Sequence, residues 1–245
     1  MTGASIALVF LFGLLTLVSY VDRLYQEIGA GYLSTVQAMV QVTDARERYG
    51  AGHAERVRAY CAAAADALGL DGAQKATLEL AALFHDLGHV GVPEAVLGKP
   101  GALTAEEWAL VRRHPLLGVS ILKQVPRMEA VVPVILQHHE RYDGQGYPAG
   151  LLGDDSSPLA QVLAVADAYE AMTSARPHRG ALSRAEAVAE LRRHSGTQFA
   201  PRAVEAFVAA TAGAVETAPS AEHSLLRLLH PAPIRLDLVG GSPID

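Results

Sequence analysis

Hydrophobic residues recur at helical spacing along most of this chain. An unbroken apolar run comes first, and no charged side chain interrupts residues 2–21. Further helical patterns follow it, over residues 53–68, 73–84, 104–114, 128–139, 159–173, 184–194 and 201–212. Alternating patterns typical of strands are missing, apart from a weak extended segment at 234–239. The pattern therefore predicts an all-α protein.

The apolar run at the start is long enough to cross a bilayer. Twenty helical residues at ~1.5 Å each cover ~30 Å, the thickness of the hydrocarbon core. A cleaved signal peptide is the alternative, but no Lys or Arg precedes the run and Ser-Tyr-Val at 19–21 is a poor cleavage site. We expect residues 1–23 to be a transmembrane anchor. Arginines that follow the run favour a cytoplasmic location for the rest of the chain.

The remaining residues divide into three parts. We expect residues 24–43 to form a linker helix, broken or kinked near Gly29 and Gly31, and residues 44–212 to form the globular domain. Residues 213–245 are rich in Pro, Gly and Ser and are expected to be a partly disordered tail.

Charge and cysteine content narrow the class of protein. The 245 residues carry a net charge of −6, which disfavours a protein that coats nucleic-acid polymers. The single cysteine, Cys61, excludes a disulfide within the chain and is interpreted as a small buried hydrophobic residue.

The candidate chemistry centres on residues 83–91, L-F-H-D-L-G-H-V-G. Here an apolar helix delivers His85 and Asp86 to its own end, and Gly88, Gly91 and Pro93 predict that a loop follows. A lone His-Asp pair is more often a helix cap or a surface feature. The functional interpretation therefore depends on what other segments contribute.

Metal-binding residue types recur on the inward faces or at the ends of the other apolar helices. The full set is His53, His85, Asp86, His114, His138, His139 and Asp167. Asp167 interrupts an apolar run, so its carboxylate needs a partner when buried. Nitrogen and oxygen donors without cysteine suit a dinuclear site for Fe, Mn or Zn, in which one Asp bridges two ions.

The order and spacing of several motifs resemble the HD-GYP domain family over residues 44–210. The motifs are H-D-L-G (85–88), V-P-E-A-V-L-G-K-P-G-A-L-T (92–104), H-P (114–115), H-H-E (138–140), D-G-Q-G-Y-P (143–148) and V-A-D-A-Y-E-A-M-T-S-A-R-P-H-R (165–179). The resemblance implies the all-helical bundle of the HD superfamily around a dinuclear metal centre. It also implies a bacterial phosphodiesterase that hydrolyses cyclic di-GMP to pGpG and GMP. Together with the expected anchor, this predicts a location in the cytoplasmic (inner) membrane.

The resemblance further implies a role for each matching residue. One ion would be held by His53, His85, Asp86 and Asp167, and the other by His114, His138, His139 and the bridging Asp86. Fe or Mn are the expected ions, and a hydroxide between them would attack phosphorus. Asp86 and His89 are the predicted catalytic residues. The predicted substrate-binding residues are Gly146, Tyr147, Arg176 and Arg179.

The sequence departs from the family pattern at a few positions. His89 stands where Lys is usual and Glu170 where Asp is usual, while Tyr49 replaces the Glu of trinuclear members, which favours two ions. The first two departures keep an alternative open: a weak or inactive module that senses cyclic di-GMP or binds proteins. Homodimerisation through residues 24–44 and a diguanylate cyclase partner are further hypotheses.

Overall fold

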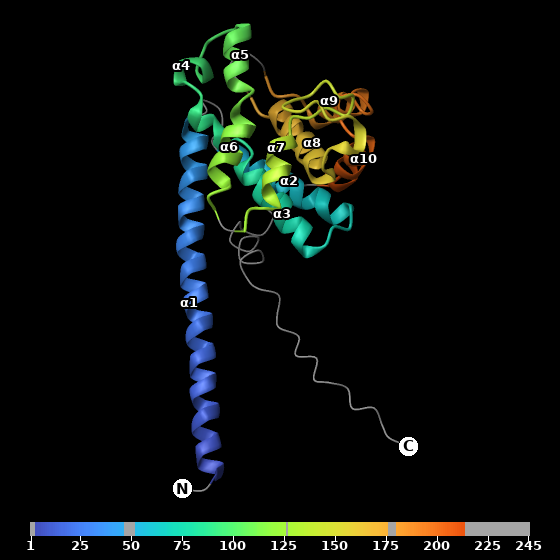
Figure 1. Cartoon of the computed structure of the whole chain (residues 1–245). Coiled ribbons are helices and arrows are strands. Elements are labelled where there is room, and N and C mark those ends of the chain that lie inside the picture. Colours follow the sequence, from blue (N-terminus) through green and yellow to red (C-terminus); the bar gives the residue numbers. More distant parts are fainter. Residues whose placement is uncertain (1–2, 47–51, 126, 176–179, 214–245) are drawn as a thin grey trace, which may run out of the picture.

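The computed structural model describes residues 3–46, 52–125, 127–175 and 180–213, and its regular elements are helices (Figure 1). They are α1 (Gly3–Arg46), α2 (His53–Ala67), α3 (Gly72–Phe84), η1 (Leu87–Gly91), α4 (Glu94–Leu97), α5 (Ala105–Val111), α6 (His114–Leu122), α7 (Val131–Gln137), η2 (Gly153–Asp155), α8 (Pro158–Thr173), α9 (Arg184–Arg193) and α10 (Pro201–Ala210). Extended pairing within these ranges is limited to two isolated bridges. The prediction of an all-α fold is confirmed for the described residues.

The core forms where α2, α3, α7, α8 and α10 pack against one another. Helix α3 is buried without interruption from Ala76 to Phe84, which fits a sequence that is apolar there except at Thr77 and Glu79. On the α10 side, the rings of Tyr60, Tyr169 and Phe207 lie 5.0 to 5.8 Å apart. This core holds the ends of α3 and α7 next to α8.

Polar side chains fix where several helices begin. Thr104 and Glu107 form a capping box at the start of α5, and Asp71 and Ser183 start α3 and α9 in the same way. The helix predicted over 104–114 is α5, which ends three residues earlier, at Val111, and a further helix that the sequence analysis did not predict, α6, begins at His114. His114 therefore lies at a junction between helices.

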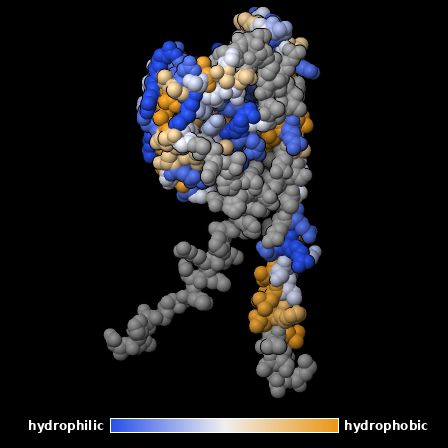
Figure 2. All heavy atoms as spheres, turned by 180° about the vertical axis from the view of Figure 1, so that it is seen from behind, coloured by the Kyte–Doolittle hydropathy of each residue, from blue (hydrophilic) through white to orange (hydrophobic). Residues whose placement is uncertain are grey.

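Helix α1 is continuous through Gly29 and Gly31, so the expected break at these glycines is absent. Its C-terminal part packs against α2 and η1, while its first half extends beyond the domain (Figure 1). Exposed apolar side chains such as Phe10, Phe12 and Leu14 gather on that half (Figure 2).

The predicted transmembrane anchor at residues 1–23 is not supported. A bilayer crossing requires about 20 consecutive, predominantly apolar helical residues. Among the helices that the structure describes, none is both long and apolar enough to meet this requirement.

Residues 87–91 form a short 3-10 helix, η1, where the sequence predicted a loop. Side chains three residues apart eclipse each other in such a helix. Gly88 and Gly91 accordingly both face α6, where a Cβ on Gly88 would lie 1.8 Å from the His114 carbonyl oxygen. Leu87 and Val90 both line a groove against the C-terminal part of α1.

A buried ion pair joins helices α2 and α3. Arg58 of α2 donates to Glu79 of α3 over 3.0 Å, and both side chains are about 5% exposed. Such a pair contributes little net stability, but either charge left alone would be costly to bury. It therefore favours one alignment of α2 along α3.

Some sequence predictions lie outside the described residues. They concern the tail beyond residue 213, the extended segment at 234–239, and both Arg176 and Arg179.

Replacing Gly88 with alanine tests the close contact between η1 and α6. The added methyl group would collide with backbone of α6, so we expect Gly88→Ala to lower the free energy of unfolding by about 1–3 kcal/mol, as overpacking does. Gly72→Ala is the matched control, because a Cβ at Gly72 meets no atom within 4 Å. Urea denaturation of both variants measures the difference, and equal stability would contradict this contact.

Candidate metal centre

The seven predicted metal ligands converge from five segments of the chain. His53 begins α2, His85 and Asp86 follow α3, His114 begins α6, His138 and His139 follow α7, and Asp167 lies in α8. Three overlapping groups have donor atoms within 4.8 Å of one another: His53, His85 and Asp86; His114, His138 and His139; and Asp86, His89 and His114. Residues far apart in sequence thus form one cluster.

Asp86 lies between two sets of histidines. Its Oδ2 is 3.0 Å from His85 Nε2 and 3.6 Å from His53 Nε2. Its Oδ1 points the other way and is 3.5 Å from His114 Nε2. Asp167 belongs to the first set, since its Oδ1 is 3.4 Å from His53 Nε2. The two carboxylate oxygens of Asp86 therefore serve the two sets separately.

Three of the histidines are oriented by the same kind of local hydrogen bond. Nδ1 of His85, His114 and His138 donates to the carbonyl oxygen three residues earlier, over 2.8, 2.8 and 2.6 Å respectively. These carbonyls lie in the last turns of α3, α5 and α7, where intrahelical partners run out. Because a carbonyl only accepts, Nδ1 carries the proton and Nε2 points into the cluster.

His53 is oriented differently because it begins its helix. The start of a helix presents N–H groups rather than spare carbonyls, and Nδ1 of His53 instead lies 2.6 Å from Oε2 of Glu170. Glu170 is buried and also accepts from Arg56 and Ser174 over 2.6–2.7 Å. In the sequence Glu170 stands out only as a departure from the family pattern, and its position three residues after Asp167 in the same apolar run was the signal available for its role.

The two sets differ in their electrostatics. In the first set burial disfavours the imidazolium, but hydrogen bonds to Asp167 and Glu170 outweigh burial and raise the pKa of His53 to about 11. Burial likewise opposes charge on His85, yet Asp86 raises its pKa to about 9. In the second set burial prevails, and the pKa of His114 falls to about 4 and that of His139 to about 3.

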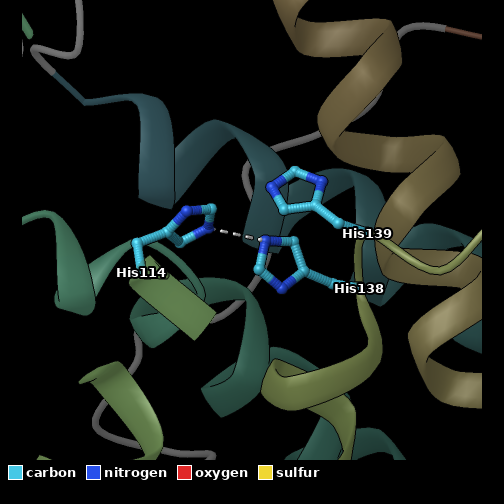
Figure 3. Close-up of side chains that lie close together, drawn as sticks. All are labelled: His114, His138 and His139. Carbon is cyan, nitrogen blue, oxygen red and sulfur yellow. Dashed lines mark hydrogen bonds between the residues drawn. The ribbon is translucent and has the colours of Figure 1, made fainter. Parts of the chain in front are cut away.

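The donor atoms of the cluster fit divalent metal ions. His53 Nε2 and His85 Nε2 are 3.2 Å apart, and His114 Nε2 and His138 Nε2 are 3.4 Å apart (Figure 3). With Nδ1 carrying the proton, neither member of a pair can hydrogen-bond to the other as a neutral imidazole. Two donors that bind one ion at ~2.1 Å lie ~3–4 Å apart. A cation between each pair would use both lone pairs.

The D-G-Q-G-Y-P loop folds against this centre. Its Tyr147 ring lies 4.9 Å from the His139 ring, and the Arg112 guanidinium lies 5.5 Å from the centre of the Tyr147 ring. Buried Glu140 holds the segment that follows the loop by accepting from the backbone N–H groups of Ala149 and Leu151 over 2.7 and 3.0 Å. Gly146 is required because a Cβ there would lie 2.2 Å from the backbone nitrogen of Arg141.

Most of the domain is similar in sequence and fold to known proteins. The family model described as an HD domain matches residues 37–203. The solved structure "Bd1817, a HDG"Y"P protein from Bdellovibrio bacteriovorus" superposes with a TM-score of 0.54 at 28% identity, covering 66% of this chain and 52% of that one.

Two curated relatives carry functional names. The cyclic di-GMP phosphodiesterase response regulator RpfG of Xanthomonas campestris is 36% identical over 176 residues, 71% of this chain and 47% of its own length. The 3'3'-cGAMP-specific phosphodiesterase 3 of Vibrio cholerae is 36% identical over 166 residues, 68% of this chain and 36% of its own. This chain thus spans less than half the length of either relative. Together with the cluster and the loop, the family match shows that the chain belongs to the HD domain family and contains an HD-GYP domain.

Proposed function

We propose that this domain is a metal-dependent phosphodiesterase that hydrolyses cyclic di-GMP to pGpG and GMP. The observation that carries the proposal is the position of Asp86, whose two oxygens face two separate histidine sets. Two divalent ions in these sets, Fe or Mn, would activate a water molecule and neutralise charge on the phosphoryl oxygens. The substrate class is supported by the name of the Xanthomonas relative.

The chain's own residues would hold and orient the phosphodiester. The Tyr147 phenol keeps its proton, because burial, together with the charges of Asp86 and Asp167, raises its pKa. Tyr147 can therefore donate a hydrogen bond to a phosphoryl oxygen. Arg112 beside its ring adds positive charge at the same edge. Arg176 and Arg179 stay predicted phosphate contacts.

A second substrate has specific support, because the Vibrio relative is named for 3'3'-cGAMP. Both cyclic dinucleotides contain the same phosphodiester bonds and differ in one base. The histidine cluster acts on phosphate and does not discriminate between them, so the bases must be selected by contacts elsewhere in the site.

A turnover assay tests the proposal. The full chain would be stripped of metal, loaded with Fe(II) or Mn(II) without oxygen, and incubated with cyclic di-GMP or 3'3'-cGAMP. We expect about two ions per chain and conversion of cyclic di-GMP to pGpG or GMP, followed by chromatography. Tight binding without turnover would favour the sensor alternative, and neither binding nor turnover would contradict the proposal.

Replacing Asp86 with asparagine tests its position between the two sets. The amide has the same shape but lacks the charge that two cations require, so metal content should fall. Turnover should drop by more than about 100-fold. Mutation of a residue that only hydrogen-bonds to a metal ligand already lowers metal affinity or activity by about 10–100-fold. Asp155→Asn, at an exposed carboxylate in η2, is the control. Normal metal content and activity in Asp86→Asn would contradict the assignment.

Replacing Glu170 with glutamine tests how His53 is positioned. The hydrogen bonds from His53, Ser174 and Arg56 outweigh burial and lower the pKa of Glu170 to about 2, so the group is a carboxylate that the neutral amide cannot replace. We expect one ion to bind about 10–100-fold more weakly, while the ion at His114 is retained.

The control for this variant is Glu190→Gln. Glu190 of α9 forms a similar pair with a histidine, since its Oε1 lies 3.1 Å from His194 Nε2. Metal titration of both proteins gives the comparison. An equal loss of affinity for both ions in Glu170→Gln would show that Glu170 does not act through His53 alone.

A further inference from the structure

The 3-10 geometry of η1 directs a further imidazole to the metal centre. Asp86 is the N-cap of η1, and the backbone N–H of His89 donates to the Asp86 carbonyl oxygen over 2.9 Å. With three residues per turn, the side chains of Asp86 and His89 emerge on the same side. His89 Nδ1 lies 3.9 Å from Asp86 Oδ1, the oxygen that faces His114.

The ring of His89 also lies against the second histidine set. Its centroid is 4.2 Å from that of His114, and its side chain is only 13% exposed. Donor atoms of Asp86, His89 and His114 all fall within 4.8 Å of one another. A distance of 3.9 Å is too long for a hydrogen bond, but it is within the ~3–4 Å that separates two donors bound to one ion.

His114 has one lone pair to offer, because its Nδ1 donates to the Val111 carbonyl. A cation held by His114, His138 and His139 would therefore also be the cation of the group of Asp86, His89 and His114. We propose that His89 is an additional ligand of this cation, which makes a set of four imidazoles and one carboxylate oxygen. Such a set suits a first-row divalent transition metal.

A fifth protein donor would change how accessible the cation is to water and substrate. On an ion that accepts six ligands, five protein donors would leave one position for water or a phosphoryl oxygen, whereas four would leave two. His89 would therefore tighten binding of the cation while restricting access to it. The inference rests on the metal centre of the proposed function and not on the identity of the substrate.

Metal affinity tests the assignment without any need for turnover. The full chain, stripped of metal, would be titrated with Mn(II) against a chelating indicator and with Co(II), whose absorption reports the number of ligands. In His89→Ala we expect one ion to dissociate about 10–100-fold more readily, an unchanged affinity for the other ion, and an altered Co(II) spectrum. His194→Ala removes a histidine of α9 outside the cluster and should change neither affinity.

A second variant distinguishes the loss of a metal ligand from a general disturbance of the fold. His89→Phe keeps a ring against His114 but has no donor atom, so it should weaken the same ion as His89→Ala. Wild-type affinities and an unchanged Co(II) spectrum in both variants would overturn the inference, even if the protein hydrolyses cyclic di-GMP. Selective weakening of one ion would support it, even if neither cyclic dinucleotide is hydrolysed.

Discussion

The three-residue period of η1 is the constraint on which the site depends. Each of its three faces makes a different contact. Asp86 and His89 face the histidines, Gly88 and Gly91 allow close contact with α6, and Leu87 and Val90 face α1. An α-helix turns by 100° per residue and would spread these pairs apart. The 3-10 geometry keeps each pair aligned, so one short element connects the metal centre, the core and the long helix.

Local geometry also orients most of the histidines. Helix ends leave carbonyl groups without partners, and His85, His114 and His138 each use one such group to fix a tautomer. The orientation of these rings is therefore decided within a few residues of sequence. His53 has no such carbonyl at the start of α2 and depends on Glu170, 117 residues away. The His53 set is accordingly more sensitive to how the helices pack.

Charge is distributed unevenly across the centre. Asp167 and Glu170 belong to the His53 set, whereas the His114 set receives a single carboxylate oxygen from Asp86. Without metal, carboxylates favour imidazolium at His53, and burial favours neutral imidazole at His114 and His139. Cations must therefore displace protons on one side but find lone pairs already available on the other.

The sequence by itself determined the helical class, most helix positions and the set of polar residues that converge. This was possible because helical periodicity and histidines at the ends of apolar runs are local patterns. Local patterns predicted a loop in place of η1, because glycine suits both a loop and a close helix contact, and they did not predict α6. They also predicted a membrane span that the described helices do not support.

Only the tertiary structure decided how these residues act together. The division of Asp86 between two sets, the partnership of Glu170 with His53, and the approach of His89 to His114 each join segments that the sequence separates. Distances of this kind depend on the packing of α2, α3, α6, α7 and α8 around one core. A pattern along the chain identifies a donor and its helix, but the packing of that helix decides which other donors it meets.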